Sequence, residues 1–233
     1  MRRLLKDGDP WVRSASVRFL EATDMRTRVD LAWPLLDDPV RVVRLEAARV
    51  LAPLLRQQLP EPLRRTLTAA VEEYAQSLAV TAERPESQLS LGLLAVAVGD
   101  AAQAEQAYRR ALTLEPGFVP AYVNLADLYR ALGREDDGEA ILRAGIVAAP
   151  DDASLPHALG LLLVREQRLP EALAMLALAE ERDPEQPRYA YVYALALEST
   201  GETDKALAVL RKAGERHPGN PEIRDALERL GSP

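Results

Sequence analysis

The chain has 233 residues, of which 48% are hydrophobic, with no cysteine, two histidines and a formal net charge of −7. This apolar content suffices to bury a core and argues against disorder, while 17 prolines argue against a long coiled coil. The lack of cysteine excludes disulfides, thiolate metal sites and cysteine nucleophiles within this sequence, and two histidines leave little for a histidine-ligated metal or a catalytic triad.

Charge and hydropathy differ along the chain. The opening segment, Met1 to Lys6, lacks the apolar run of a secretory signal, and no apolar stretch reaches the roughly 18 residues that a membrane-spanning helix needs. Residues 1–66 carry a net charge of +4 and residues 67–233 a net charge of −11, which suggests two modules. The acidic module disfavours nucleic acid as a partner, because it would repel phosphate.

Residues 1–58 match themselves at a 31-residue interval, which defines a first module of residues 1–60. Leu4–Asp7 corresponds to Leu35–Asp38, and Arg13 corresponds to Arg44. This pattern resembles HEAT-like helical repeats, which implies pairs of helices here. Residues 1–7 look like the end of a second helix whose repeat is otherwise absent. The chain is therefore either a fragment of a longer protein or has its first face covered by another element.

The arginines of this segment allow two interpretations. They could form a basic strip for an acidic partner, or they could make structural pairs with carboxylates and helix-end carbonyl groups. We favour structural pairs. The arginines concerned are Arg13, Arg18, Arg41, Arg44 and Arg49.

Residues 61–84 are expected to form a connecting helix. Three of its positions keep the register of the repeat that follows, each lying one repeat length before its counterpart: Ala70, Tyr74 and Ser77. The segment thus has the pattern of the second helix of a repeat that lacks its first helix. Prolines at 60 and 62 would break a first helix at that place. We place the module boundary there.

A 34-residue interval organises residues 85–220. It links four prolines: Pro116, Pro150, Pro184 and Pro218. It also links four positions that are glycine in all but one case: Gly99, Gly133, Gln167 and Gly201. A third series is small throughout: Gly92, Ala126, Gly160 and Ala194. The period and this order of small, large and proline positions resemble the tetratricopeptide repeat (TPR), with copies at 85–118, 119–152, 153–186 and 187–220.

Each copy is expected to form two antiparallel helices. A small residue at the eighth position lets the second helix approach, and large residues such as Tyr108 and Leu142 should fill the space between repeats. The glycine or glutamine at the fifteenth position should end the first helix, where a left-handed cap suits glycine. Residues 221–233 then read as an amphipathic capping helix. One repeat cannot bury its own apolar face, so we predict an all-α fold, a right-handed superhelix of HEAT-like and TPR repeats.

The TPR resemblance implies a concave groove lined by the first helices, suited to an extended segment or a helix. Asn124 is singled out because its amide can pair with a peptide backbone. Tyr191, beside Arg188, is a candidate anchor for the ligand, because tyrosine and arginine are enriched at binding hot spots. His157 is expected to be an ordinary groove residue. The two-carboxylate clamp of chaperone-tail-binding TPRs is matched only at Asn124. The groove positions are Leu89, Leu93, Val123, Asn124, Asp127, Arg130, His157, Leu161, Arg165, Arg188, Tyr191, Leu195 and Glu198.

These features predict a non-catalytic scaffold, without cofactor, metal or membrane insertion, that binds a peptide or protein segment in the groove. The alternative is the C-terminal docking region of a larger redox protein, because HEAT-like repeats before TPRs also resemble part of predicted bacterial multihaem cytochromes c. A start at residue 1 would imply a cytoplasmic protein, and a cytochrome fragment would imply a periplasmic one. Homo-oligomer formation stays open.

Overall fold

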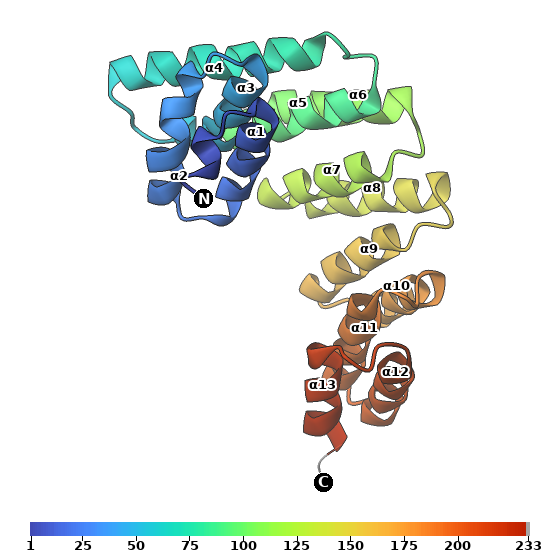
Figure 1. Ribbon diagram of the computed structural model, residues 1–233. Coiled ribbons are helices and arrows are strands. Elements are labelled where there is room, and N and C mark those ends of the chain that lie inside the picture. The colour runs from blue at the N-terminus through green and yellow to red at the C-terminus, as the bar shows by residue number, and fades with distance from the viewer. Residues whose placement is uncertain (232–233) are drawn as a thin grey trace. The chain divides into compact units, whose positions relative to one another are not determined.

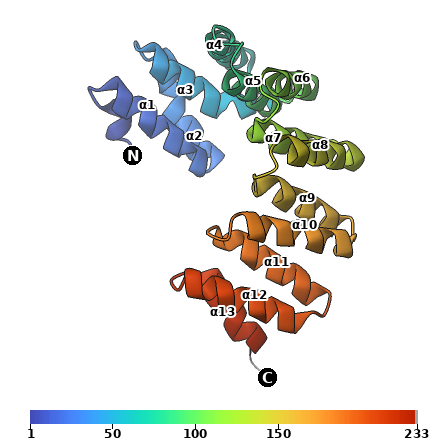
Figure 2. The same cartoon turned by 90° about the vertical axis from the view of Figure 1, so that its right-hand side faces the viewer.

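The computed structural model describes residues 1–231 and is all-helical over that range, with thirteen α-helices and no strand (Figures 1 and 2). This confirms the predicted all-α fold. The chain divides into two compact units, Met1–Glu115 and the part from Pro116 onward. The first unit therefore contains the segment with the 31-residue interval, the connecting helix and the first copy of the 34-residue pattern.

The first unit alternates short α-helices with 3-10 turns. Its α-helices are α1 (Pro10–Arg18), α2 (Met25–Ala32), α3 (Arg41–Leu51), α4 (Glu61–Ala79), α5 (Pro85–Val98) and α6 (Ala101–Leu114). Its 3-10 helices are η1 (Leu4–Lys6), η2 (Phe19–Ala22), η3 (Trp33–Asp37) and η4 (Ala52–Arg56). One continuous core runs from Leu5 through Leu51 and Leu67 to Leu94, so α4 and α5 share it with the preceding helices.

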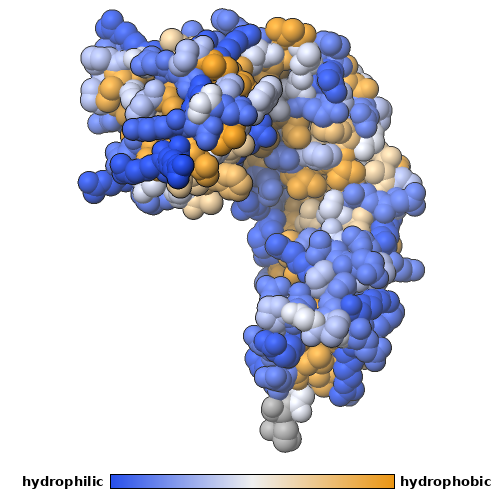
Figure 3. Space-filling view, viewed as in Figure 1, coloured by the Kyte–Doolittle hydropathy of each residue, from blue (hydrophilic) through white to orange (hydrophobic). Residues whose placement is uncertain are grey.

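The second unit is a run of helical hairpins: α7 (Val119–Ala131), α8 (Glu135–Ala148), α9 (Ser154–Arg165), α10 (Leu169–Arg182), α11 (Pro187–Ser199), α12 (Thr203–Arg216) and α13 (Pro221–Gly231). Each odd-numbered helix up to α11 packs on the even-numbered helix that follows it, and α13 packs on α12 and α11. Figure 3 shows apolar surface where α12 and α13 meet. The last two positions of the predicted capping helix, 232 and 233, lie outside the described residues.

Small residues set the distance between the two helices of a hairpin. A Cβ on Gly92 of α5 would lie 2.2 Å from the ring of Tyr108 on α6, and one on Gly160 of α9 would lie 2.7 Å from Leu176 on α10. Tyr108 and Leu176 are both buried. Tyr108, which the sequence predicts to fill space between repeats, packs over the glycine of its own hairpin, where the missing side chain leaves room for the ring.

The turns inside the hairpins have the predicted conformation. The φ angles at Gly99, Gly133 and Gly201 are +90°, +69° and +80°, and Gln167 at the corresponding position has +62°. Gln167 is the only non-glycine residue with positive φ among residues 1–231. The fifteenth position of each copy thus requires the left-handed region, which costs a non-glycine residue free energy.

The arginines of the first unit are paired, as favoured from the sequence. The Arg13 guanidinium donates to the Asp38 carboxylate at 2.8 and 2.9 Å and to the backbone carbonyl of Asp7 at 2.7 Å. Arg44, its counterpart in the second copy, donates to the carbonyl of Asp38 at 2.9 Å and to the Glu73 carboxylate. Desolvation of the buried Asp38 carboxylate opposes its ionisation, but the hydrogen bonds from Arg13 and from the Val40 amide outweigh that effect and lower its pKa.

The remaining arginines of this set follow the same scheme. Arg18 and Arg49 share the Glu46 carboxylate, and Arg49 also pairs with Glu21. Arg41 joins Arg44 at Glu73 on α4. All five arginines therefore hold neighbouring helices together, and none of them is left as an unpaired basic strip.

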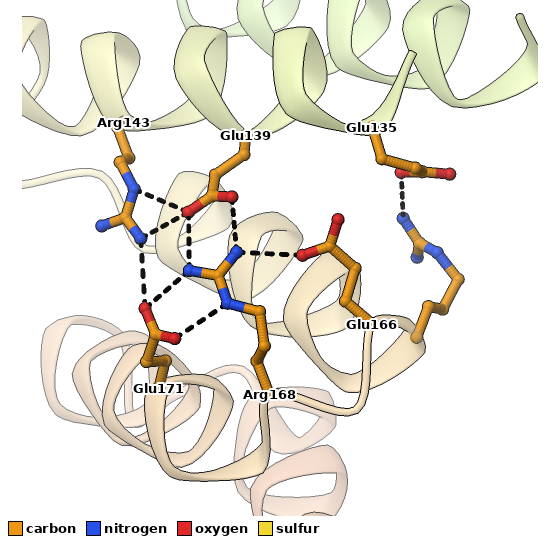
Figure 4. A network of polar contacts seen from close by, with 7 residues as sticks. Glu135, Glu139, Arg143, Glu166, Arg168 and Glu171 are labelled. Atoms are coloured by element: carbon orange, nitrogen blue, oxygen red, sulfur yellow. Dashed lines mark hydrogen bonds and ion pairs between the residues drawn. The ribbon is translucent and has the colours of Figure 1, made fainter. Parts of the chain in front are cut away.

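A second arginine-centred network joins two hairpins of the second unit (Figure 4). Arg168 lies at the start of α10 and pairs with Glu139 of α8 at 2.6 Å, with Glu166 at 3.0 Å and with Glu171 at 2.7 Å. Arg143 of α8 adds contacts to Glu139 and Glu171. The Arg168 hydrogen bond is the main cause of the lowered pKa of both Glu139 and Glu171. Because several charges share the network, it is worth more than isolated surface pairs.

We predict that Gln167→Gly stabilises the protein by about 0.5–1 kcal/mol, because glycine adopts the left-handed region without steric cost. Gln106→Gly is the matched control: Gln106 lies exposed in the middle of α6, where the same exchange should cost about 1 kcal/mol. Urea unfolding of both variants measures the difference. A loss of stability in Gln167→Gly would contradict the assignment of strain to this turn.

Candidate binding surface

The predicted groove positions lie on first helices in both units. Leu89 and Leu93 are on α5 of the first unit. Leu93 is exposed and lines a hollow of about 370 Å³ within that unit, together with Pro53, Tyr74 and Ala97. Leu89 is half-buried and does not line this hollow. The other predicted positions all lie in the second unit, on α7, α9 and α11.

A hollow of about 320 Å³ forms between α7, α9 and α11 of the second unit. Its apolar lining includes Val123, Ala126, Leu161 and Leu162, and its polar lining comes from all three helices and their first turns. The structure brings six predicted residues together here: Val123, Asp127, His157, Leu161, Arg165 and Arg188. Such a volume accommodates one or two side chains, at the low end of ligand pockets.

His157 is the central polar group of the hollow. The residue is only 8% exposed, and neither ring nitrogen has a hydrogen-bond partner. The Tyr189 ring of α11 lies against it, with ring centroids 4.8 Å apart and planes inclined by 48°. Burial, with a smaller contribution from the Arg188 charge, lowers the pKa of His157 to about 4. The imidazole is therefore neutral at pH 7.

Two arginines border the hollow. Arg165 of α9 is half-exposed, and its nearest carboxylate is Glu135, at 4.0 Å. Arg188 of α11 is exposed and has no carboxylate within 4.0 Å among residues 1–231. Asp127 brings the opposite charge but is paired with Arg130 of its own helix, at 3.3 Å. The rim thus presents unneutralised positive charge at Arg188.

Other predicted residues do not reach this hollow. The Asn124 amide donates to the Pro120 carbonyl of its own helix at 2.8 Å. Tyr191 packs against the apolar cluster of α11, α12 and α13, and the Glu198 carboxylate accepts from Arg229 of α13 at 3.0 Å. Leu195 is half-buried and lies outside the hollow, as does Arg130, which pairs with Asp127.

Tyr189 is the aromatic residue that the sequence interpretation missed. The family positions select Tyr191 for the groove, whereas the structure places Tyr189 beside His157 in the hollow. Helix spacing places Tyr189 and Tyr193 on one face and Tyr191 on another, which predicts core packing for the first two and leaves Tyr191 for the groove. The contact with His157, on the first helix of the preceding hairpin, decides the assignment.

Paired antiparallel helices at a fixed interval, with side chains of successive first helices meeting in one hollow, define a helical-repeat protein. A sequence model of the tetratricopeptide repeat matches residues 63–117 and 157–221, more than half of the chain, and a second model with the same description matches residues 95–162. The chain therefore belongs to the tetratricopeptide-repeat family. Proteins of this family generally mediate protein–protein interactions and are generally non-catalytic.

Solved structures show the same fold. A crystal structure of MamA is 22% identical with a TM-score of 0.52, and the match covers 63% of this chain and 80% of MamA. MamA from Desulfovibrio magneticus RS-1 is 21% identical with a TM-score of 0.50, covering 76% and 97%. The TPR protein YrrB is 18% identical with a TM-score of 0.51, covering 84% and 97%. No curated protein sequence matches this chain.

Neither a candidate membrane-spanning helix nor a candidate metal site is present among residues 1–231. Residues 1–231 contain no helix with the length and hydropathy to cross a bilayer. The same residues contain no group of three or more histidines and carboxylates placed to hold a metal ion.

The lowered pKa of His157 gives a testable pH dependence. Between pH 6.5 and about 4 the unfolded chain binds a proton at this residue that the folded chain does not, so folding stability falls as pH falls through that range. The His157→Leu variant should not show this loss of folding stability, which in the wild type amounts to about 3 kcal/mol at most. It should also be more stable at pH 7 by about 1–3 kcal/mol, because two buried unpaired nitrogens are removed.

Urea unfolding of wild type and His157→Leu at pH 7, 5.5 and 4 measures both effects, and the difference between the two proteins cancels the titration of the shared carboxylates. Equal pH profiles for the two proteins would show that His157 titrates normally in the folded state.

Proposed function

We propose that this protein is a non-catalytic scaffold that binds a peptide or protein segment on the first-helix surface of its second unit. The observation that carries the proposal is the hollow between α7, α9 and α11, where Val123, His157, Leu161 and Arg188 meet. Three helices from successive hairpins each supply lining residues, so a segment lying across them would contact all three.

The character of the lining supports a segment of polypeptide as the ligand. Its floor is apolar, its rim is charged, and a tyrosine and two arginines are of the types enriched at binding hot spots. Among the solved structures with this fold, YrrB is described as having an unusual peptide-binding site. That site belongs to YrrB, and it serves here as a precedent for peptide binding by the fold. The cytochrome alternative rests on sequence resemblance alone.

The α13 helix limits the surface available to the ligand. Its Arg229 holds Glu198, and its apolar residues Ile223 and Leu227 join the cluster that contains Tyr191. We infer that the ligand contacts α7, α9 and the start of α11, and that the last predicted groove positions serve α13 instead.

Peptide selection on the purified protein tests the proposal. A displayed library of random peptides is panned against the full chain, and the dissociation constant of the selected peptides is measured by fluorescence anisotropy. Leu161→Glu places a charge in the apolar floor, and Ala158→Gln fills the hollow without adding charge. Both should weaken binding by about tenfold or more.

Val147→Glu is the control, because Val147 is 82% exposed on α8 and does not line the hollow. It should change the dissociation constant by less than about twofold. Circular dichroism melts of all three variants verify folding. Selected peptides that bind equally well to folded Leu161→Glu and Ala158→Gln, or a selection that yields no binding peptide, would refute the proposal.

A further inference from the structure

The hollow contains polar groups that the protein leaves without partners. Both nitrogens of His157 are buried and unpaired, although buried polar atoms nearly always find a hydrogen-bond partner. Arg188, on the neighbouring helix, carries a charge that no carboxylate of residues 1–231 neutralises within 4.0 Å. Other arginines of the same unit do have carboxylate partners, as Arg168 with its three shows (Figure 4).

The chemistry of these groups selects the ligand. A neutral imidazole offers one N–H donor and one acceptor, and a guanidinium offers only donors. A carboxylate accepts from both and neutralises the arginine charge, and hydrogen bonds of this charge-assisted kind are the strong ones. A cationic side chain would instead meet Arg188 and Arg165 at the rim. An uncharged amide would satisfy His157 but leave the arginine charge uncompensated.

The remaining lining fits the rest of an acidic side chain. Val123 and Leu161 provide apolar contact for methylene groups, and the volume of about 320 Å³ suits a side chain rather than a large cofactor. Asp127 is the one acidic residue of the lining, and its pairing with Arg130 reduces its repulsion of a second carboxylate.

We propose that this hollow is the subsite for an acidic residue, glutamate or aspartate, of the bound segment, with its carboxylate held by His157 and Arg188. This inference rests on the proposed function and specifies the ligand of the same surface. Tyr189 fixes the imidazole by ring contact, so that the donor is placed before the ligand arrives.

Occupation of the subsite has an electrostatic consequence at His157. The charged and titratable groups around it are Asp127 on α7, Arg165 on α9, and Arg188 with Tyr189 on α11, with Glu135 of α8 beside Arg165. The Asp152 and Asp183 carboxylates also act on Tyr189, and they keep the same charge in the free and the bound protein. A bound carboxylate adds a negative charge next to the imidazole, which favours its protonated form. The pKa of His157 should therefore rise from about 4 when an acidic ligand binds.

NMR titration of the two histidines provides the test, since His157 and His217 give only two sets of ring signals. The probes are two pools of pentapeptides, Ac-X-X-Glu-X-X-NH2 and Ac-X-X-Gln-X-X-NH2, where X is an equal mixture of alanine, leucine and serine. We expect the glutamate pool to shift the His157 signals saturably, to bind at least about fivefold more tightly than the glutamine pool and to raise the pKa of His157. The His217 signals serve as the internal reference.

Arg188→Gln should remove the preference for glutamate, whereas Arg211→Gln, which deletes the same charge from an exposed position on α12, should keep it. Equal binding of both pools, an unchanged His157 pKa at saturation, or no effect of Arg188→Gln would overturn the acidic subsite. If the selected peptides of the preceding test still depend on Leu161 while the pools show no glutamate preference, only the acidic subsite fails. If no peptide binds in either test, the proposed function fails with it.

Discussion

The close contact between the two helices of each hairpin is the constraint on which this structure depends. Tyr108 lies over Gly92, and Leu176 lies over Gly160, at distances that no side chain on the glycine would allow. This contact fixes the second helix against one side of the first. The opposite side of the first helix stays free of its own partner, so its side chains can line a surface. The hollow is lined mainly by residues of the first helices α7, α9 and α11, with Leu142 of α8 added.

Much of this architecture could be predicted from the sequence, because it depends on local and periodic signals. The left-handed residues at 99, 133, 167 and 201 follow from one column of the 34-residue interval. The structural role of Arg13 and Arg44, which each bind groups of neighbouring helices, follows from the 31-residue interval. The partner of Arg44 does not follow in this way. It is Glu73 of the connecting helix, which lies outside the 31-residue pattern.

The candidate site was harder to predict, because it depends on contacts between helices. Repeat positions correctly indicated that Val123, His157 and Arg188 lie on first helices, yet they could not show which of three tyrosines meets His157. They also could not show that α13 engages Glu198, since no repeat position describes the capping helix. Asn124 lies on the expected helix, but its side-chain amide donates to the Pro120 carbonyl of that helix.

The arginines of the first unit have a consequence for how such a chain changes length. Arg13 and Arg44 each bind a backbone carbonyl that precedes their own helix and a carboxylate farther along, so one copy of the sequence carries both a donor and an acceptor for its neighbours. Duplication of such a copy introduces no unpaired charge. The series ends at Arg44, whose carboxylate partner is Glu73 of α4 and not the aspartate of a further copy, so the helix that follows the last copy still completes its ion pair.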